Sequence, residues 1–382
     1  MGSSMDRHSM EELIEIASAF NVDGVPAEAK PIGNGHINDT YLVTSRAEAG
    51  DRAACTRKYI LQRINHGVFS EPDKVMENIT RVTDHLKNKI EGEGGDPDRE
   101  TFTVIRLRDT EGSSPQAGQT LYRNSDGTCW RMITYIDGTF TCESASAASC
   151  NAADIMYETG LGYGKFMQRL ADFPAEELHE TIPGFHDTRR RYNDLMRAFD
   201  VDIMGRAPEV SEEIRFIRNR EQDVDVLAEM VRKGELPLRI THNDTKLSNI
   251  LFDSTSGKAI CVIDLDTVMP GLAVTDFGDA IRSGASTGRE DEGNPDKVRL
   301  DPDLYHAFHR GFIEGFPQLT QTERDMLAFG AKIMTLECGI RFLTDYLEGD
   351  TYFKTDHLGQ NLARCRAQLA LVRDMERKGI GQ

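Results

Sequence analysis

The pattern of apolar and polar positions changes its period along the chain. Apolar residues recur at helical spacing from Ser9 to Phe20 and again over 72–89, which predicts two amphipathic helices. Shorter runs rich in β-branched and aromatic residues predict strands at 37–44, 59–64, 102–107 and 130–136. The first two runs are separated by a polar stretch, so they predict a hairpin with a long loop. The first part of the chain is therefore predicted to be rich in strands.

Beyond Asp137-Gly138 the pattern becomes mainly helical. Helical spacing recurs over 152–170, 188–199 and 212–233, and a short apolar strand is expected at 237–240. At least two more helices are predicted to close the chain. We expect an α+β fold with two lobes, a β-rich N-terminal lobe over 10–137 that binds nucleotide and a mainly helical catalytic and substrate-binding lobe over 138–382.

Composition excludes several classes of partner. The chain has 382 residues, of which 39% are hydrophobic and 28% charged, as in ordinary globular proteins. Its net charge of −18 repels nucleic acid and acidic membranes, so neither is an expected partner. Seven cysteines without a CxxC pair favour reduced thiols in a cytoplasmic protein, and no apolar stretch approaches the length of a membrane span.

One segment has the residue spacing of a kinase catalytic loop. His242-Asn243-Asp244-Thr245-Lys246-Leu247-Ser248-Asn249 reads H-x-D-x-x-x-x-N, in which the Asp receives the substrate proton and the Asn binds magnesium. The spacing alone is weak evidence in a chain of this length, so its context matters. We expect His242 to brace the loop through hydrogen bonds and to carry no proton in the reaction.

The segment after this loop supports the interpretation. Two strand-like runs, 249–252 and 259–263, are joined by a polar turn that includes Gly257, which predicts a hairpin. Antiparallel pairing would place Asn249 almost opposite Asp264, beside Asp244, where the two side chains offer hard oxygen ligands for Mg²⁺. Asp266 is a second candidate for the metal or the substrate. The competing interpretation is that these are only polar residues at strand ends.

Asp276-Phe277-Gly278 spells the magnesium motif of protein kinases but lies too late in the chain. The segment Met269-Pro270-Gly271 turns the chain away from the hairpin before it. We therefore expect Asp276 to be an N-cap that opens a helix rather than a metal ligand.

The order of the motifs HNDTKLSN, VIDLD and DFGDAIR resembles the aminoglycoside phosphotransferase and choline kinase superfamily, which has a bilobal protein-kinase-like fold. Further segments resemble the bacterial N-acetylhexosamine 1-kinases from about Ile32 to the C-terminus. These segments are GNGHINDTY at 33–41, YILQ at 59–62, FHDT at 185–188, 264–271, ECGIRF at 337–342 and LEGD at 347–350.

This resemblance implies an activity and a set of roles. ATP would phosphorylate the anomeric hydroxyl of N-acetylglucosamine or N-acetylgalactosamine, with Asp244 as base and Mg²⁺ on Asn249 and Asp264. Gly33 and Gly35 would let the first hairpin approach the nucleotide, although an ordinary tight turn explains them equally well.

The resemblance also implies three sugar contacts besides Asp244, namely His36, Asn38 and Arg341. For His36 and Asn38 a plain polar hairpin tip is an equal alternative. Glu337, Arg341 and Asp345 share one helix face, which is more often solvated, but the apolar flanks of this stripe predict a largely buried helix.

One position departs from the protein-kinase pattern. Gln62 stands where the phosphate-binding lysine is expected, unless the register slips to Arg63, and this leaves Glu77 without its expected partner. Tyr135 and Ile136 are predicted to form the hinge that packs against adenine, with ordinary core residues as the alternative.

Other functions remain open. The same fold serves kinases of choline, homoserine, methylthioribose and aminoglycosides. A regulator that binds nucleotide without catalysis is a further alternative, which the intact Asp244, Asn249 and Asp264 argue against.

Overall fold

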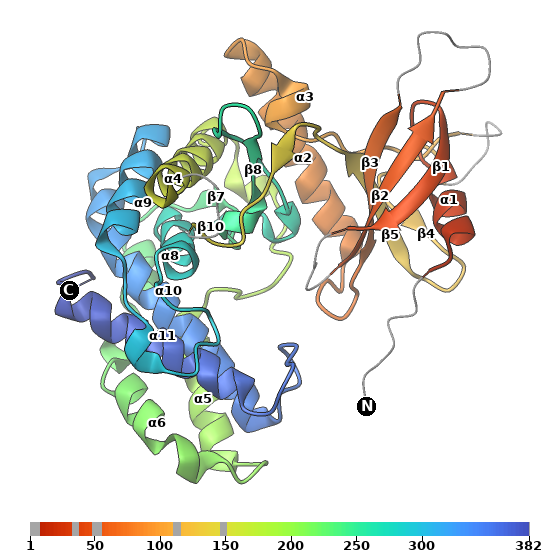
Figure 1. Ribbon diagram of the computed structural model, residues 1–382. Helices are drawn as coiled ribbons and strands as arrows, with labels where there is room; N and C mark the ends of the chain where they lie inside the picture. Colours follow the sequence, from red (N-terminus) through yellow and green to blue (C-terminus); the bar gives the residue numbers. More distant parts are fainter. Residues whose placement is uncertain (1–7, 33–37, 48–55, 110–115, 146–150, 382) are drawn as a thin grey trace. The chain divides into compact units, whose positions relative to one another are not determined.

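The computed structural model describes residues 8–32, 38–47, 56–109, 116–145 and 151–381. The chain forms two compact units, Met1–Asp137 and Gly138–Gln382. The first unit is built on a β-sheet and the second is mainly helical, so the predicted α+β class with a β-rich N-terminal part and a helical C-terminal part is confirmed (Figure 1).

The first unit is a five-stranded sheet with helix α1 against one face (Figure 1). The strands lie in the order β1-β2-β3-β5-β4, and the registered pairs among them are antiparallel. Alternate residues of the central strands pack on α1, among them Tyr41, Leu61 and Trp130. The elements of this unit are α1 (Met10–Ser18), β1 (Val25–Pro31), β2 (Asp39–Arg46), β3 (Arg57–Ile64), α2 (Pro72–Gly92), α3 (Pro97–Glu100), β4 (Tyr122–Arg123) and β5 (Cys129–Thr134).

Two sequence predictions for this sheet were incomplete. Strand β1 was missed because its sequence VPAEAKP contains two prolines and few residues that favour strands. The sheet tolerates them because β1 is an edge strand. The run 102–107 joins β5 only through single contacts such as the Val104–Ile133 bridge, and does not form a regular strand.

The second unit is a group of helices around two small antiparallel sheets. One sheet has the order β6-β8-β9 and the other pairs β10 with β7. The strands are β6 (Thr139–Phe140), β7 (Arg239–Thr241), β8 (Ile250–Asp253), β9 (Ala259–Val262) and β10 (Met269–Gly271). The α-helices are α4 (Ala152–Arg169), α5 (Thr188–Val201), α6 (Ser211–Arg218), α7 (Val226–Arg232), α8 (Ala273–Gly284), α9 (Pro302–Gly315), α10 (Gln321–Glu348) and α11 (Gln360–Arg377).

The single helix predicted over 212–233 is wrong. The chain forms α6 and α7 there, with a 3₁₀ turn at Glu221–Asp223 between them. The break falls in the polar run that begins at Asn219, where no apolar residue is available to continue the buried face. Within the described residues, no helix has the length and apolar character needed to cross a membrane.

Close helix packing in this unit depends on glycine. A Cβ on Gly160 of α4 would lie 2.2 Å from the Phe308 carbonyl oxygen of α9. A Cβ on Gly278 of α8 would likewise lie 2.3 Å from the Gly330 carbonyl oxygen of α10. Because a larger side chain would separate each pair of helices, Gly160 lets α4 pack directly on α9 and Gly278 lets α8 pack directly on α10.

Candidate active site

The loop between β7 and β8 is supported by the buried side chain of His242. Its Nε2 lies 2.8 Å from the Ile263 carbonyl oxygen, and its Nδ1 accepts a hydrogen bond from the Asp244 backbone N–H at 3.2 Å. These two bonds require the neutral tautomer with the proton on Nε2. His242 is fully buried and braces the loop, as the sequence analysis expected.

Asp276 of α8 supports the same loop from the other side. Its carboxylate accepts the backbone N–H groups of His242 at 2.7 Å and Asn243 at 2.9 Å. Burial raises the pKa of Asp276 to about 6, against the opposite effect of these two hydrogen bonds. A carboxylate committed to two backbone donors has a structural role.

The predicted cap at Asp276 is nevertheless wrong. Helix α8 begins at Ala273 after Leu272, so Asp276 lies inside its first turn and points to the loop instead of capping its own helix. The neighbours of Asp276 are structural as well, because Phe277 is fully buried and Gly278 allows the close contact with α10.

Asn243 holds the backbone in a left-handed conformation, with φ 64°. This conformation is unfavourable for a residue with a side chain, and neighbouring bonds maintain it. Its amide nitrogen donates to the Thr267 carbonyl oxygen at 2.9 Å, and its Oδ1 accepts from the Thr241 hydroxyl at 3.0 Å. The loop backbone before Asp244 is therefore determined by several contacts at once.

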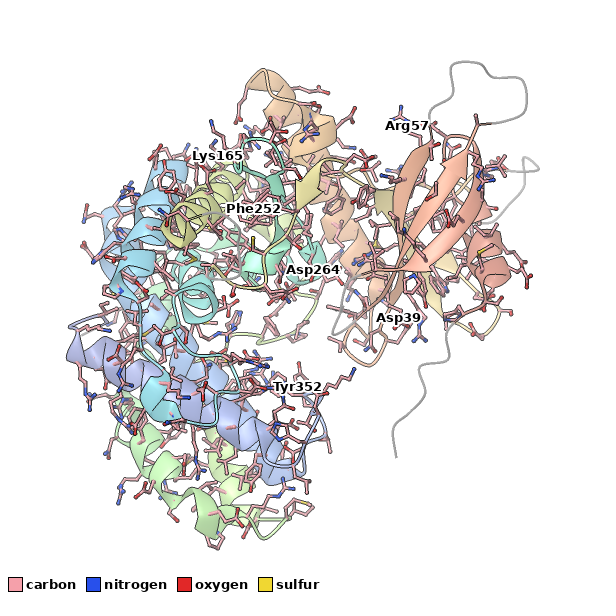
Figure 2. The ribbon with its side chains drawn as sticks, viewed as in Figure 1. Asp39, Arg57, Lys165, Phe252, Asp264 and Tyr352 are labelled. Atoms are coloured by element: carbon pink, nitrogen blue, oxygen red, sulfur yellow. The ribbon has the colours of Figure 1, made fainter. Side chains whose placement is uncertain are left out.

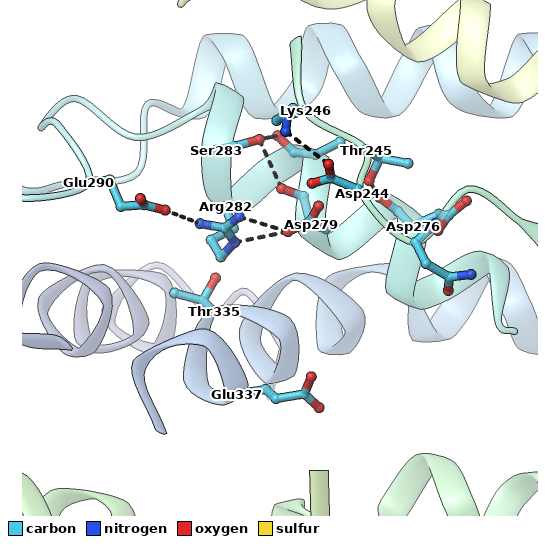
Figure 3. A network of polar contacts seen from close by, with 12 residues as sticks. Asp244, Thr245, Lys246, Asp276, Asp279, Arg282, Ser283, Glu290, Thr335 and Glu337 are labelled. Atoms are coloured by element: carbon cyan, nitrogen blue, oxygen red, sulfur yellow. Dashed lines mark hydrogen bonds and ion pairs between the residues drawn. The ribbon is translucent and has the colours of Figure 1, made fainter. Parts of the chain in front are cut away.

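Asp244 is the acidic residue of this loop, and 31% of its side chain is exposed to solvent. Lys246 donates to its Oδ2 at 2.8 Å (Figure 3). Asn249 Nδ2 donates to the backbone carbonyl oxygen of Asp244 at 2.9 Å. Burial alone would raise the pKa of Asp244, but the Lys246 ammonium outweighs it and the net pKa is lowered. Asp244 is therefore a carboxylate at neutral pH and can accept a proton.

Lys246 lies in the catalytic-loop motif, but the sequence analysis assigned it no role. Burial opposes its charge, yet Asp244 and Asp264 raise its pKa, so the ammonium is permanently charged near neutral pH. A cation beside this carboxylate could offset the negative charge of an anionic ligand that approaches Asp244. Its position two residues after Asp244 was the feature of the sequence that could have indicated this role.

The β8–β9 hairpin brings the two candidate metal ligands together. Ile250 pairs with Val262, and the Ile263 N–H donates to the Asn249 carbonyl oxygen at 3.0 Å. Asp264 follows directly, with an exposed side chain and a left-handed backbone at φ 63° (Figure 2). The hairpin and its open end were predicted correctly.

These two residues suit Mg²⁺. The Asn249 amide nitrogen is directed to Asp244, so its Oδ1 is the atom that would meet a cation, and Asp264 adds a carboxylate. Among the described residues there is no cluster of three or more His, Cys, Asp or Glu side chains arranged for a metal. Two oxygen ligands are the usual protein share of a Mg²⁺ that also binds phosphates and water. Asp266, the second candidate, is buried at 5% exposure and is less accessible.

Helix α10 contributes a row of charged residues whose partners the structure identifies. Glu337 is buried and accepts from the Thr188 hydroxyl at 2.5 Å, with His186 Nδ1 2.9 Å from its other oxygen. Asp345 accepts three consecutive backbone N–H groups, those of 351–353, and so holds that loop. The helix is largely buried, as predicted, and each of these two carboxylates has a structural purpose.

Arg341 lies between these two residues on α10. Its guanidinium stacks over the rings of Phe185 at 5.2 Å and Phe353 at 5.6 Å. Within the described part of the chain it has no hydrogen bond or ion pair of its own, so its donors remain available to a ligand. Burial lowers the pKa of Arg191, and the nearby positive charge of Arg341 lowers it further. The sequence analysis missed Arg191.

Comparison with known proteins identifies the family of this chain. A family model described as "Phosphotransferase enzyme family" matches residues 28–316, which include the catalytic loop and both candidate metal ligands. The chain belongs to this phosphotransferase family.

Solved structures show the same fold at low identity. One is a microcompartment-associated aminopropanol kinase with 15% identity and a TM-score of 0.56, where the match covers 97% of each chain. Another is an ethanolamine kinase from Plasmodium vivax with 15% identity and a TM-score of 0.50, covering 89% of this chain and 82% of the other.

In this phosphotransferase the first unit carries the remaining predicted site residues. Gly33, Gly35 and His36 lie outside the described residues. Asn38 is buried, and its Oδ1 accepts from the Asn65 backbone N–H at 3.0 Å, which ties the end of the β1–β2 connection to the residue after β3. Tyr135 and Ile136 follow β5 directly, and the Tyr135 N–H donates to the Lys58 carbonyl oxygen at 3.2 Å.

The register of β3 shows where Gln62 and Arg63 lie in the sheet. Gln62 pairs with Arg131 and Thr40 without a slip, and its side chain bonds to both, at 2.8 Å and 3.1 Å. Arg63 points to the opposite face of the sheet, because successive strand residues alternate, and it binds Asp39 instead. Glu77, whose partner was in doubt, forms an ion pair with Arg81 on its own helix.

Proposed function

We propose that this phosphotransferase uses ATP and Mg²⁺ to phosphorylate the anomeric hydroxyl of N-acetylglucosamine or N-acetylgalactosamine, giving the sugar 1-phosphate and ADP. The observation that carries the kinase chemistry is Asp244, a partly exposed carboxylate with a lowered pKa, held beside Lys246 and Asn249. The choice of sugar rests on the resemblance to N-acetylhexosamine 1-kinases and on the free donors of Arg341.

In the proposed reaction Asp244 orients the anomeric hydroxyl and accepts its proton. The hydroxyl oxygen forms a bond to the γ-phosphorus while the bond from that phosphorus to the bridging oxygen of ADP breaks. Lys246 offsets charge on the transferred group, and Asn249 and Asp264 would hold Mg²⁺, which neutralises the phosphate oxygens when bound. Gly33, Gly35, Gln62, Tyr135 and Ile136 are proposed to contact the nucleotide.

Arg341 is the proposed sugar contact with the strongest structural support. A neutral N-acetyl sugar offers hydroxyl and carbonyl oxygens, which a guanidinium with unoccupied donors can bind. Its contacts with the Phe185 and Phe353 rings are cation–π contacts, which leave the N–H groups able to donate to a ligand. His36 and Asn38 remain proposed contacts on the resemblance alone.

A cationic acceptor is the main competing proposal, since the solved structures with this fold include an aminopropanol kinase and an ethanolamine kinase. An ammonium group would need a carboxylate or an open aromatic face. Here Arg341 already lies over one face of each of the two rings, and Glu337 is already bonded to Thr188 and His186. The positive charges of Arg341 and Arg191 therefore favour a neutral, oxygen-rich acceptor.

Measuring ADP release with a panel of acceptors tests this proposal. The panel contains both N-acetylhexosamines, glucose, choline, ethanolamine, aminopropanol, homoserine and an aminoglycoside, with Asp244→Asn as the inactive control. We expect turnover with the N-acetylhexosamines and a product that is non-reducing and acid-labile, because phosphate at C1 blocks the anomeric carbon. Turnover confined to choline or another amine would reject the sugar and keep the kinase chemistry.

A further inference from the structure

Two histidines hold the two ends of a single peptide group, the one that joins Asn243 to Asp244. The N–H of this group donates to His242 Nδ1 at 3.2 Å. Its carbonyl oxygen lies 3.3 Å from His186 Nε2. The orientation of this peptide group sets the position of the Asp244 Cα, from which the side chain extends. Both histidines therefore influence the position of the proposed catalytic carboxylate.

The second contact of His186 determines its protonation state. Its Nδ1 lies 2.9 Å from Glu337 Oε1, and its Nε2 faces the Asn243 carbonyl oxygen, so both ring nitrogens face acceptors. A neutral imidazole has one N–H and can satisfy only one of them, whereas the imidazolium donates to both. By the same reasoning His242 is neutral, because one of its nitrogens accepts.

We propose that His186 is an imidazolium that positions Asp244, by donating to the carbonyl oxygen of Asn243 while Glu337 of α10 holds its other nitrogen. Glu337 lies one helical turn before Arg341, so this link would also set the catalytic loop against the helix that carries the proposed sugar contact. The proposal rests on the phosphotransferase function and not on the identity of the acceptor.

The charges around His186 agree with this assignment. Burial disfavours the cation, but the hydrogen bond and charge of Glu337, with Asp279 of α8, raise the pKa of His186 above its usual value against the opposing charge of Arg341. Asp276 of α8 also interacts favourably with it. The ring contacts Phe185 as well, at a centroid distance of 4.6 Å.

The pH dependence follows from the sign of this shift. Because the pKa is raised in the folded protein, the positioning effect is complete below the ordinary histidine pKa of about 6.5 and is lost as the pH rises through the folded pKa. Loss of the proton leaves one of the two acceptors without a donor, and the peptide group before Asp244 loses one of its two supports. We expect kcat to fall on this alkaline limb, with little change in the Michaelis constant for ATP.

The decisive variant is Glu337→Gln, which keeps the shape but removes the charge that stabilises the imidazolium. We expect the alkaline limb of the kcat profile to move down by about one pH unit or more. Thr188→Val is the matched control, since it removes the other hydrogen bond to Glu337 without removing its charge. This control should show no downward movement of the limb.

Nitrogen NMR of the intact protein gives a readout that does not depend on any acceptor. At pH 7 both ring nitrogens of His186 should carry protons and His242 should be the Nε2–H tautomer, with assignments from His186→Asn and His242→Asn. A neutral His186 at pH 7 overturns the proposal, and so does an alkaline limb that Glu337→Gln leaves in place. If the protein phosphorylates no N-acetylhexosamine, the sugar assignment fails while the NMR result still decides the role of His186.

Discussion

The catalytic loop and strand β3 each carry a residue on which the proposed chemistry depends, but they hold it in different ways. Asp244 lies on a loop whose backbone N–H groups donate to the side chains of His242 and Asp276. The Asn243 side chain ties the same loop to the Thr267 carbonyl oxygen. Gln62 is held by side chains on two adjacent strands, Thr40 and Arg131. Buried backbone bonds thus fix the proposed base in the second unit, and cross-strand pairing fixes the proposed phosphate contact in the first.

This difference separates two kinds of effect. Changes on the loop should act on the chemical step or on the stability of the second unit. Changes on β3 should act on nucleotide affinity and leave the chemical step intact. The following experiments test this separation, beginning with the largest expected effect.

Asp244→Asn should lower kcat by ~10²-fold or more and leave the dissociation constant of ATP nearly unchanged. The amide keeps the shape of the side chain but cannot accept the proton. Steady-state kinetics and calorimetric titration with ATP measure the two quantities. Loss of ATP binding would instead make Asp244 a structural residue.

Asp264→Ala should weaken nucleotide affinity in the presence of Mg²⁺ by about tenfold or more and leave the Mg²⁺-free affinity unchanged. Asp276→Ala should chiefly lower the melting temperature, because two buried backbone N–H groups lose their acceptor. ADP titrations with and without Mg²⁺, together with thermal melts, compare the two variants. The reverse pattern would show that Asp276 is the metal ligand.

Arg341→Ala should lower kcat/KM for the sugar by about tenfold, the cost of leaving polar groups of a bound substrate unpaired, with little effect on the Michaelis constant for ATP. Arg197→Ala is a matched control, since this arginine is 68% exposed and pairs only with Asp194 of its own helix among the described residues. An equal effect of both substitutions would argue against a sugar contact at Arg341.

Gln62→Met should weaken ATP binding by a few-fold, about 1 kcal/mol, and leave adenosine binding unchanged. The substitution removes the bonds to Thr40 and Arg131 while keeping the length of the side chain. Competition titrations with ATP and adenosine separate the phosphate contribution from that of the base. A parallel loss of both ligands would mean that Gln62 only supports the sheet.

The smallest effect concerns pH and Asp276. Its pKa is raised to about 6 in the folded protein, so the folded state binds this proton more tightly than the unfolded chain. Its contribution to the free energy of unfolding is therefore complete below about pH 4 and is lost as the pH rises through about 6. Asp276→Asn should remove this component from denaturant titrations between pH 4 and 7. An unchanged pH dependence would mean that a group other than Asp276 titrates in this range.

How much of the structure the sequence predicted depends on how far apart along the chain the interacting residues lie. The β8–β9 hairpin was predictable because its two strands and turn lie within 249–263, although the pattern did not reveal the register shift between Leu251 and Phe252. Strand β1 and the break between α6 and α7 were not, because an edge position and a missing apolar face override the local preferences of their residues. The cap assigned to Asp276 failed for a similar reason, since its partners lie 33 and 34 residues earlier in the chain.

The sequence by itself determined the order of the chemical groups in the catalytic segment, from Asp244 through Asn249 to Asp264, because a short loop and a tight hairpin leave little choice of geometry. Tertiary structure decided which other residues act on that segment. Packing of α8 and α10 brings Asp276 and, through His186, Glu337 to the same loop, and no local pattern could reveal this. Buried charges and backbone groups must find partners wherever the fold brings elements together, so such contacts follow the packing and not the spacing along the chain.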